Sequence, residues 1–377
     1  MLISFKLLTF SFLVAHPIRH SPRVVSPSAV IIAVLPVYLL ILAGAIFRKT
    51  GVLRHEHDAG IMRVVYYVML PCFMLDKILG ADVLRSGPTV AWAMILGFGG
   101  IMAGLAIAWG VARLLGLQKG TGMRTFTIAA GCQNFGFTAV PVLEILWGSG
   151  ACAMVFVHNL GVDVAIWSVG VMILSGDREM PWRKLLNGPM FAVCIGLLLV
   201  LVGLDQYITG PFRKVISQLG VGAFPVAIMI TGATMVGLSV AEKPSPKIIL
   251  GSLAVRLCLA PLVILAAAKY LPMVDELRQV LVVQAAMPAA MTPIMLARLY
   301  GGRPAIAVQV VLATTIGSIV TLPWIIYWGI HWVGLKPLVP PTPQQVASTM
   351  QSHCPSGEEV VYFTKTNLRL ALPEGSP

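Results

Sequence analysis

The hydrophobic positions of this chain gather into long runs, and short segments between the runs carry most of the charged residues. An α-helix needs about 20 apolar residues to cross the core of a bilayer. Runs of that kind therefore predict membrane-spanning helices. Five runs hold no charged residue: Ala29–Phe47, Pro88–Ala112, Gly188–Leu204, Leu219–Ala241 and Pro304–Ile330.

Five further runs are interrupted by only a few polar residues. They are Gly60–Leu79, Thr125–Gly148, Cys152–Ser175, Ile248–Ala268 and Val280–Leu299. Together the runs predict an all-α polytopic membrane protein with ten transmembrane helices, each separated from the next by a short loop.

Composition agrees with a membrane protein. Hydrophobic residues make up 57% of the 377 residues, charged residues only 11%, and the mean hydropathy is +0.86, whereas soluble domains carry about 25% charged residues. The net charge of +12 does not indicate nucleic-acid binding, because the basic residues lie in the loops between the runs. The six cysteines are scattered without the spacing of metal ligands, so we expect no metal site, cofactor or disulfide framework.

The distribution of basic residues predicts the orientation. If the loop after the first run is cytoplasmic, thirteen Lys and Arg residues fall on the cytoplasmic side and seven on the opposite side. Positive loops favour the cytoplasm, so both ends of the ten-helix unit are expected outside. On this basis the segment 178–184 is cytoplasmic and Lys336 is not, and the chain is a multi-pass protein of the cytoplasmic (inner) membrane.

Five stretches of chain follow from this pattern. Residues 1–27 form an N-terminal extension, which is either signal-like or an over-extended start, because the apolar run in it is too short to span. Residues 28–176 form a first repeat of five helices, 177–187 a cytoplasmic loop and 188–334 a second repeat. The last stretch, 335–377, is rich in Pro, Ser and Gln, which is typical of a disordered tail.

The two halves match at the fourth and ninth runs. Both runs begin with an arginine, continue with apolar residues and are interrupted in the middle, and Asn134 and Pro288 each lie ten positions after that arginine. An odd number of helices in each half would place the second half upside down in the membrane. Interrupted segments at corresponding positions of two halves are the sequence feature that best indicates the binding site of a transporter.

Polar side chains and prolines lie together at these two interruptions. In hydrocarbon every backbone N–H and C=O needs a partner, and a proline removes one donor and frees one carbonyl. Two interrupted helices that cross can meet this need with amide and hydroxyl side chains, while small residues let the backbones approach. The candidate substrate-binding residues are Gln133, Asn134, Gly136, Thr138, Gln284, Ala289 and Thr292, and the candidate breaks lie at Pro141, Pro288 and Pro293.

These motifs resemble the auxin efflux carrier family, which includes the PIN-like permeases of the bile, arsenite and riboflavin transporter superfamily. The ninth run is similar to the motif of that family at Gln284, Ala285, Ala286, Met287, Pro288, Pro293, Ala297, Arg298 and Tyr300. The fourth run has the Asn134 and Pro141 of the family pattern, but Phe137 and Ala139 replace an Asn and a Gly. The resemblance extends over about residues 31–330.

The resemblance implies ten helices in an inverted 5+5 repeat, with broken fourth and ninth helices that cross. It also implies a permease that moves a small organic anion, such as a carboxylate, by alternating access, with efflux as the expected direction. The helix starts after the two breaks would favour negative charge. We expect no Lys or Arg at the crossing, so that backbone N–H groups and Asn134 recognise the anion. A homodimer is also considered.

Charged residues inside the runs are costly and are often functional. Asp163 is the deepest of them, and with His158 and Asn159 one helical turn away it is a candidate for proton or ion coupling. The alternative is that Asp163 only bonds a neighbouring helix. Glu144 would repel an anion unless it is protonated or paired. Arg256 and Arg63 are expected to reach the interface or to be paired.

Other classes of protein are less well supported. A cation/proton exchanger or ion-coupled symporter of the same architecture is the main alternative, but an exchanger needs an acidic pair at the crossing, where this chain has amides. An intramembrane protease needs two facing aspartates or a Ser/His pair, so no enzyme is predicted. A receptor or scaffold would not need broken helices.

Overall fold

The computed structural model describes residues 27–176, 188–237 and 243–336, and every regular element in these residues is helical. The predicted N-terminal extension up to residue 26, the cytoplasmic loop at 177–187 and the tail from residue 337 onward lie outside the described residues. The long helices are α1 (Pro27–Lys49), α4 (Gly87–Leu114), α7 (Ser149–Ala165), α9 (Gly188–Leu201), α10 (Gly210–Val221), α11 (Ala223–Gly237), α14 (Asp275–Ala286) and α16 (Pro304–Val333).

The remaining helices are shorter pieces of longer segments. They are α2 (His55–Val64), α3 (Leu70–Ile78), α5 (Met123–Gly131), α6 (Ala139–Trp147), α8 (Val171–Ser175), α12 (Pro246–Ala254), α13 (Ala260–Tyr270) and α15 (Thr292–Leu299). Short 3₁₀ turns lie at η2 (Asp82–Arg85) and η6 (Leu204–Tyr207).

Seven helices in the described residues are long and apolar enough to cross a membrane. They are Val30–Lys49, His55–Ile78, Gly87–Leu114, Ser149–Ser175, Gly210–Val236, Pro246–Tyr270 and Pro304–Val333. A shorter apolar helix, Gly188–Leu201, corresponds to the predicted sixth helix. The predicted fourth and ninth helices are each split into two pieces, α5 and α6, and α14 and α15. The all-helical polytopic class is thus observed, and the count of ten spanning helices stays a prediction.

Three of the long segments contain a π-helical turn: η1 (Val65–Met69), η4 (Ile166–Gly170) and η7 (Val255–Leu259). Two of these turns come just before a proline at the start of the following helix, Pro71 in α3 and Pro261 in α13. A proline has no N–H to give to the carbonyl four residues back. The ladder adjusts by one residue, so that the N–H of Leu70 binds the carbonyl of Val65 and that of Ala260 binds the carbonyl of Val255.

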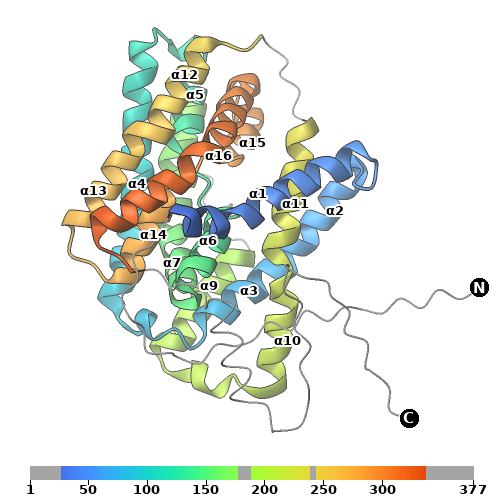
Figure 1. The fold of residues 1–377 in the computed structure, drawn as a ribbon, viewed down its shortest axis with the longest axis vertical. Coiled ribbons are helices and arrows are strands. Elements are labelled where there is room, and N and C mark those ends of the chain that lie inside the picture. The colour runs from blue at the N-terminus through green and yellow to red at the C-terminus, as the bar shows by residue number, and fades with distance from the viewer. Residues whose placement is uncertain (1–26, 177–187, 238–242, 337–377) are drawn as a thin grey trace, which may run out of the picture. The chain divides into compact units, whose positions relative to one another are not determined.

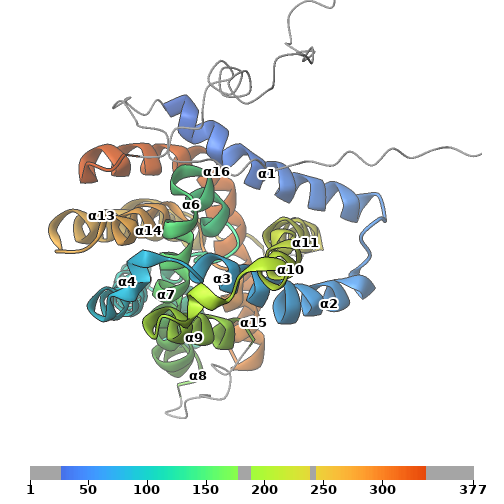
Figure 2. The same ribbon diagram turned by 90° about the horizontal axis from the view of Figure 1, so that it is seen from below.

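The helices form two bundles. In the first bundle α1 packs along α11, and α3 packs against α9 and α10. In the second bundle α4 packs along α7 and α5, and α16 packs against α12, α14 and α5. Figures 1 and 2 show α1, α2 and α11 together on one side and α4, α13 and α14 together on the other. The two broken segments belong to the second bundle.

Helix contacts in the first half recur between the corresponding helices of the second half. The first predicted helix packs on the seventh, as α1 on α11, and the sixth packs on the second, as α9 on α3. The third packs on the fourth and fifth, as α4 on α5 and α7, and the eighth packs on the ninth and tenth, as α13 on α14 and α16. These main contacts therefore occur in matching pairs.

Two glycines hold α4 and α7 unusually close. A Cβ atom added at Gly97 would lie 2.0 Å from the carbonyl oxygen of His158, and one added at Gly161 would lie 1.9 Å from that of Met94. Both distances are far below a van der Waals contact. The approach of α4 to α7, and with it the position of His158 and its neighbours, depends on the absence of side chains at these two positions.

We expect Gly97→Ala to lower the thermal stability of the purified protein, by about 1–3 kcal/mol as for other overpacked sites. Gly99→Ala, two residues away on an exposed position of the same helix with no atom within 4 Å of the added Cβ, is the matched control. It should be neutral or stabilising, since Ala favours a helix more than Gly does. Equal unfolding temperatures for the two variants would contradict the close packing of α4 on α7.

Candidate functional site

The two breaks face each other in the second bundle. The first break joins the end of α5 at Gly131 to the start of α6 at Ala139, and the second joins the end of α14 at Ala286 to the start of α15 at Thr292. The backbone N–H of Asn134 donates to the carbonyl of Pro288 at 2.7 Å, and the N–H of Ala290 donates to the carbonyl of Cys132 at 3.0 Å. These bonds frame an isolated antiparallel bridge between Gln133 and Ala289.

The bridge lets the two breaks satisfy one another. Neither segment can complete its helix, yet each offers one donor and one acceptor to the other. All residues from Leu281 to Ala290 are buried, as are Cys132 and Gln133. Backbone groups at such depth need partners, and the two bonds supply them for two N–H and two C=O groups. We use the name "crossing" below for residues 132–138 and 287–291.

The prolines occupy different places relative to the breaks. Pro288 lies inside the second break, where its carbonyl accepts the bond from Asn134. Pro293 lies at the start of α15, and Pro141 lies in the first turn of α6, positions where a missing N–H is tolerated. The first break therefore precedes Pro141. The sequence expectation that the half-helix begins after Pro141 was wrong, since α6 already begins at Ala139.

Amide side chains complete the crossing. The carbonyl of Phe135 accepts from Asn159 Nδ2 at 2.9 Å and from Gln284 Nε2 at 3.2 Å. Asn134 Nδ2 donates to Thr138 Oγ1 at 3.0 Å. The N–H of Ala289 donates to the hydroxyl of a residue that the sequence analysis did not select, Thr314 of α16, at 3.1 Å.

Some predicted side chains are left without a partner. Gln133 Oε1 and Gln284 Oε1 are buried and accept no hydrogen bond within the described part of the chain. Thr292 is half-buried, and no hydrogen bond of its side chain is found among the described residues. Gly136 is half-exposed, and a Cβ atom there would meet no atom within 4 Å. The crossing thus combines two free amide oxygens with open space beside Gly136.

A buried arginine lies at the crossing, contrary to the sequence expectation. Arg256, in the π-helical turn η7, is fully buried, and its Nη1 donates to the carbonyl of Gly131 at 3.3 Å. It neither reaches the interface nor pairs with a carboxylate among the described residues. The hydropathy pattern could not reveal the buried position of Arg256, because a single Arg in an apolar run usually indicates a side chain that extends to the membrane surface.

The candidate coupling residues lie next to the crossing on α7. Asn159 contacts it directly through the carbonyl of Phe135. His158 is buried, and its Nδ1 lies 3.3 Å from Asn159 Oδ1. Asp163 is one helical turn further and half-buried, and no hydrogen bond or ion pair of its carboxylate is found among the described residues.

Glu144 is paired, as an anion site would require. Lys77 Nζ of α3 lies 2.5 Å from Glu144 Oε1 of α6. Lys77 also lies 5.1 Å from the centre of the Phe73 ring. Because α3 belongs to the first bundle and α6 to the second, this ion pair connects the two bundles two turns of chain beyond the first break.

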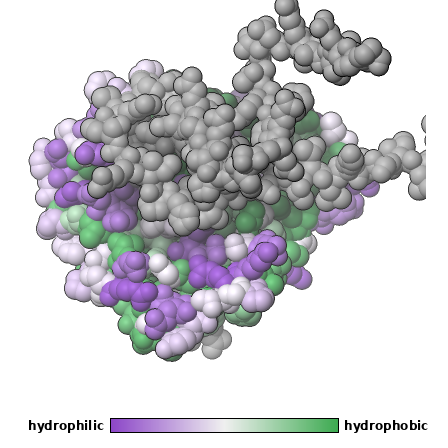
Figure 3. All heavy atoms as spheres, turned by 60° about the horizontal axis from the view of Figure 1, so that its bottom comes forward, coloured by the Kyte–Doolittle hydropathy of each residue, from purple (hydrophilic) through white to green (hydrophobic). Residues whose placement is uncertain are grey.

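Two polar cavities open on the face that holds the loops next to Lys77. The larger has a volume of about 690 Å³, and its lining includes Asp76, Arg85, Asp205, Arg213 and Lys214. The second, of about 420 Å³, shares Asp76 and Arg213 with the first and adds Lys77. Figure 3 shows hydrophilic side chains gathered on this face. No residue of the crossing lines either cavity.

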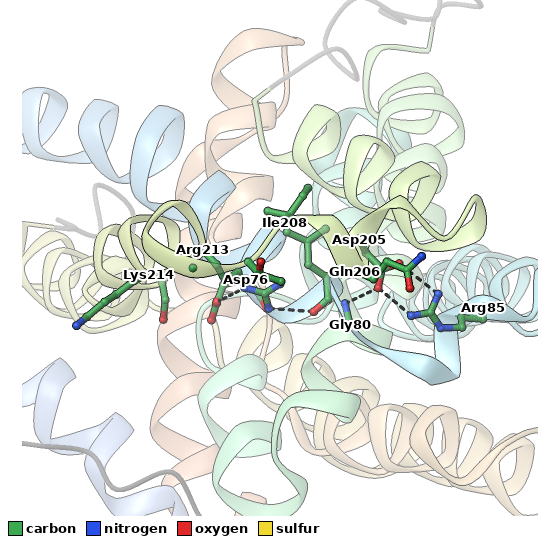
Figure 4. Close-up of a pocket in the computed structure, with 12 residues that line it drawn as sticks. Asp76, Gly80, Arg85, Asp205, Gln206, Ile208, Arg213 and Lys214 are labelled. Carbon is green, nitrogen blue, oxygen red and sulfur yellow. Dashed lines mark hydrogen bonds and ion pairs between the residues drawn. The ribbon is translucent and has the colours of Figure 1, made fainter.

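Ion pairs hold the walls of the larger cavity. Arg85 binds the buried carboxylate of Asp205 through Nη1 at 3.2 Å and Nη2 at 2.9 Å, and the N–H of Gly80 donates to the same carboxylate at 3.1 Å (Figure 4). Hydrogen bonds from Arg85 to Asp82 and to Asp205 raise the pKa of Arg85. Arg213 binds Asp76 and the carbonyl of Leu79. The cavity walls are therefore fixed to the ends of α3, α9 and α10.

The chain has recognisable relatives. A family model described as "Membrane transport protein" matches residues 29–181 and 172–326, which include the whole crossing. An uncharacterized transporter of Methanothermobacter thermautotrophicus is 27% identical over 296 residues, which cover 77% of this chain and 95% of that protein. Auxin efflux carrier component 4 of Arabidopsis thaliana is 27% identical over 228 residues, or 57% of this chain, which spans only 34% of the plant protein.

The shared carbonyl of Phe135 generates a prediction about stability. Asn159→Ala removes one of its two donors, and we expect a loss of about 0.5–1.5 kcal/mol, as for a single hydrogen bond. Combining it with Gln284→Ala should cost more than the sum of the two single changes, because the partly buried carbonyl then has no donor. A thermal-unfolding cycle of the four proteins measures this, and simple additivity would mean that the two amides do not share a role.

Proposed function

Because the chain belongs to the membrane transport protein family, of the auxin efflux carrier type, we propose that it is a secondary transporter that moves a small organic anion across the cytoplasmic membrane. The substrate class is a carboxylate and the direction is efflux. Transport occurs by alternating access around the crossing, and the chain is not an enzyme.

The observation that carries this proposal is the bridge between the two breaks. Two backbones without helical hydrogen bonds meet at Gln133 and Ala289, deep in a bundle of apolar helices. Irregular backbone at such depth is typical of transporter binding sites. The free oxygens of Gln133 and Gln284 and the half-exposed side chain of Asn134 leave hydrogen-bonding capacity for a solute.

The repeated helix contacts support an inverted 5+5 arrangement. The main helix contacts named above come in pairs that are exchanged when the two halves are exchanged, as a pseudo-twofold axis would produce. In this arrangement the second bundle carries the crossing and moves against the first bundle. The Lys77–Glu144 ion pair spans the boundary between the bundles, so it would have to open or shift during such a movement.

The main alternative is an ion-coupled carrier or cation/proton exchanger of the same architecture. Asp163 is the observation in its favour, since its carboxylate lies one turn from Asn159 and has no ion pair among the described residues. Against an exchanger, no second described carboxylate faces Asp163, and the only other acidic group of the region, Glu144, is held by Lys77. Coupling through Asp163 is compatible with anion transport, so the two ideas are tested separately.

We predict different effects for two variants of the crossing. Asn134→Ala removes a side chain that would hydrogen-bond the solute, and a charge-assisted bond is worth about 1.5–3 kcal/mol, so affinity should fall about tenfold to a hundredfold. Stability should hardly change. Pro288→Ala lets the ninth helix continue, so that it should be as stable as the parent protein but transport poorly.

The measurement uses proteoliposomes for transport and thermal unfolding for stability, after a thermal-shift screen with malate, malonate and indole-3-acetate. A ligand at a hundredfold excess over its Kd stabilises by about 2.7 kcal/mol, so a binder should stand out. If Asn134→Ala transports normally while Pro288→Ala unfolds, the breaks have an architectural role only, and the substrate site lies elsewhere.

A separate prediction concerns Asp163. If this carboxylate carries the coupling proton, Asp163→Asn should keep the fold and the binding of the solute, but transport should no longer respond to a pH gradient. Transport rates at several imposed pH gradients, for the parent protein and the variant side by side, measure this. An unchanged response in the variant would assign Asp163 a structural role.

A further inference from the structure

The helix ends at the crossing do not by themselves favour an anion. Four ends meet there: the C-terminal ends of α5 and α14, and the N-terminal ends of α6 and α15. Each helix end carries about half an elementary charge, negative at the C-terminus and positive at the N-terminus. Two positive and two negative ends cancel, so another group must set the sign of the local charge.

Arg256 is that group. Its side chain is fully buried, and Nη1 donates to the carbonyl of Gly131, the last residue of α5. The next residue, Cys132, accepts the bridge bond from Ala290 through its carbonyl. The arginine thus lies directly beside the bridge.

No neighbouring group among the described residues neutralises the charge of Arg256. Its Nε and Nη2 have no hydrogen-bond partner, and no carboxylate forms an ion pair with it among the residues described. Glu144 is bound to Lys77, and no ion pair joins Asp163 to Arg256. An arginine stays protonated in proteins. A buried charge without a counter-charge is unfavourable, and an anion that enters the crossing relieves this.

We propose that Arg256 sets the anion selectivity of the crossing: its buried guanidinium at the end of α5 makes the site net positive, so that a carboxylate is admitted and a cation is excluded. The role of Arg256 in admitting a carboxylate rests on the proposed function, which is carboxylate transport. It assigns to Arg256 a positioning role, exerted through the field and through α5, without contact with the solute.

Gly136 offers a place to measure the field directly. A Cβ there meets no atom within 4 Å, so Gly136→Cys puts a thiol in open space at the crossing. Gly136→Cys is introduced into a background protein in which serine replaces Cys72, Cys194, Cys258 and Cys354. Cys132 and Cys152 are buried and are not replaced. The probes are the anionic sulfonatoethyl and the cationic trimethylammonioethyl methanethiosulfonates, with mercaptoethanol as the uncharged reference thiol.

We expect the ratio of anionic to cationic reaction rates to exceed that of mercaptoethanol. Arg256→Gln, which keeps a donor for Gly131 but removes the charge, should lower the ratio by at least about fivefold, since a unit charge in a protein interior with an effective dielectric constant of about 20 changes each rate severalfold even at about 10 Å. Arg256→Lys should retain most of it. Arg63→Gln, at an exposed arginine of the spanning segment 55–78, is the matched control and should leave the ratio unchanged.

An unchanged ratio of reaction rates in Arg256→Gln overturns the proposal. So does a ratio in the parent background that is equal to or below the ratio for mercaptoethanol. This second result can be measured even if Arg256→Gln does not fold. A loss of thermal stability in both Arg256→Gln and Arg256→Lys with no change in the ratio would mean a purely structural role. The proposed function fails by a different result, the absence of carboxylate transport by the parent protein, which the labelling ratio does not depend on.

Discussion

The antiparallel bridge between the two breaks is the interaction on which the rest of this structure depends. In the apolar interior of the second bundle, an interrupted helix is unfavourable by itself, because its freed N–H and C=O groups have no water to bind. Here each interruption supplies hydrogen-bond partners for the other: the N–H of Asn134 binds the carbonyl of Pro288, and the N–H of Ala290 binds the carbonyl of Cys132. The amides around Phe135 and the tight packing of α4 serve to keep the two strands of backbone at this spacing.

The two bundles differ in the interactions that hold each of them together. The second bundle is tied internally by backbone and amide bonds around the crossing, whereas the ends of the first bundle are tied by ion pairs such as Arg85 with Asp205 and Arg213 with Asp76. Asp205 is buried and its partner Arg85 is partly exposed, as are both members of the second pair; the two pairs define the polar face where the cavities open. The internal order of the second bundle suits a body that moves as one piece.

Much of the crossing could be predicted from the sequence, because prolines and amides in the middle of apolar runs are conspicuous against a membrane background. The sequence indicated that Glu144 needs a proton or a partner, but it could not identify Lys77 as that partner, since the two residues are 67 positions apart in the chain. The prediction for Arg256 was wrong for a similar reason. Its neighbours in the run are apolar, and its actual partner is a backbone carbonyl, which cannot be inferred from the types of residue in the sequence. The π-helical turns were not predicted either, although Pro71 and Pro261 account for two of the three. The count of spanning helices was inferred from hydropathy alone, which cannot tell a broken helix from a continuous one.

The bridge also bears on how the protein is made. Its two strands are separated by more than half of the described chain, and contacts between distant segments form late. During synthesis the segment around Asn134 enters the membrane well before Pro288 has been translated. Its unpaired backbone must then be sheltered in some other way, by water, by the insertion machinery or by temporary helical continuation through Cys132–Thr138. The crossing can therefore form only after the second half of the chain has been inserted.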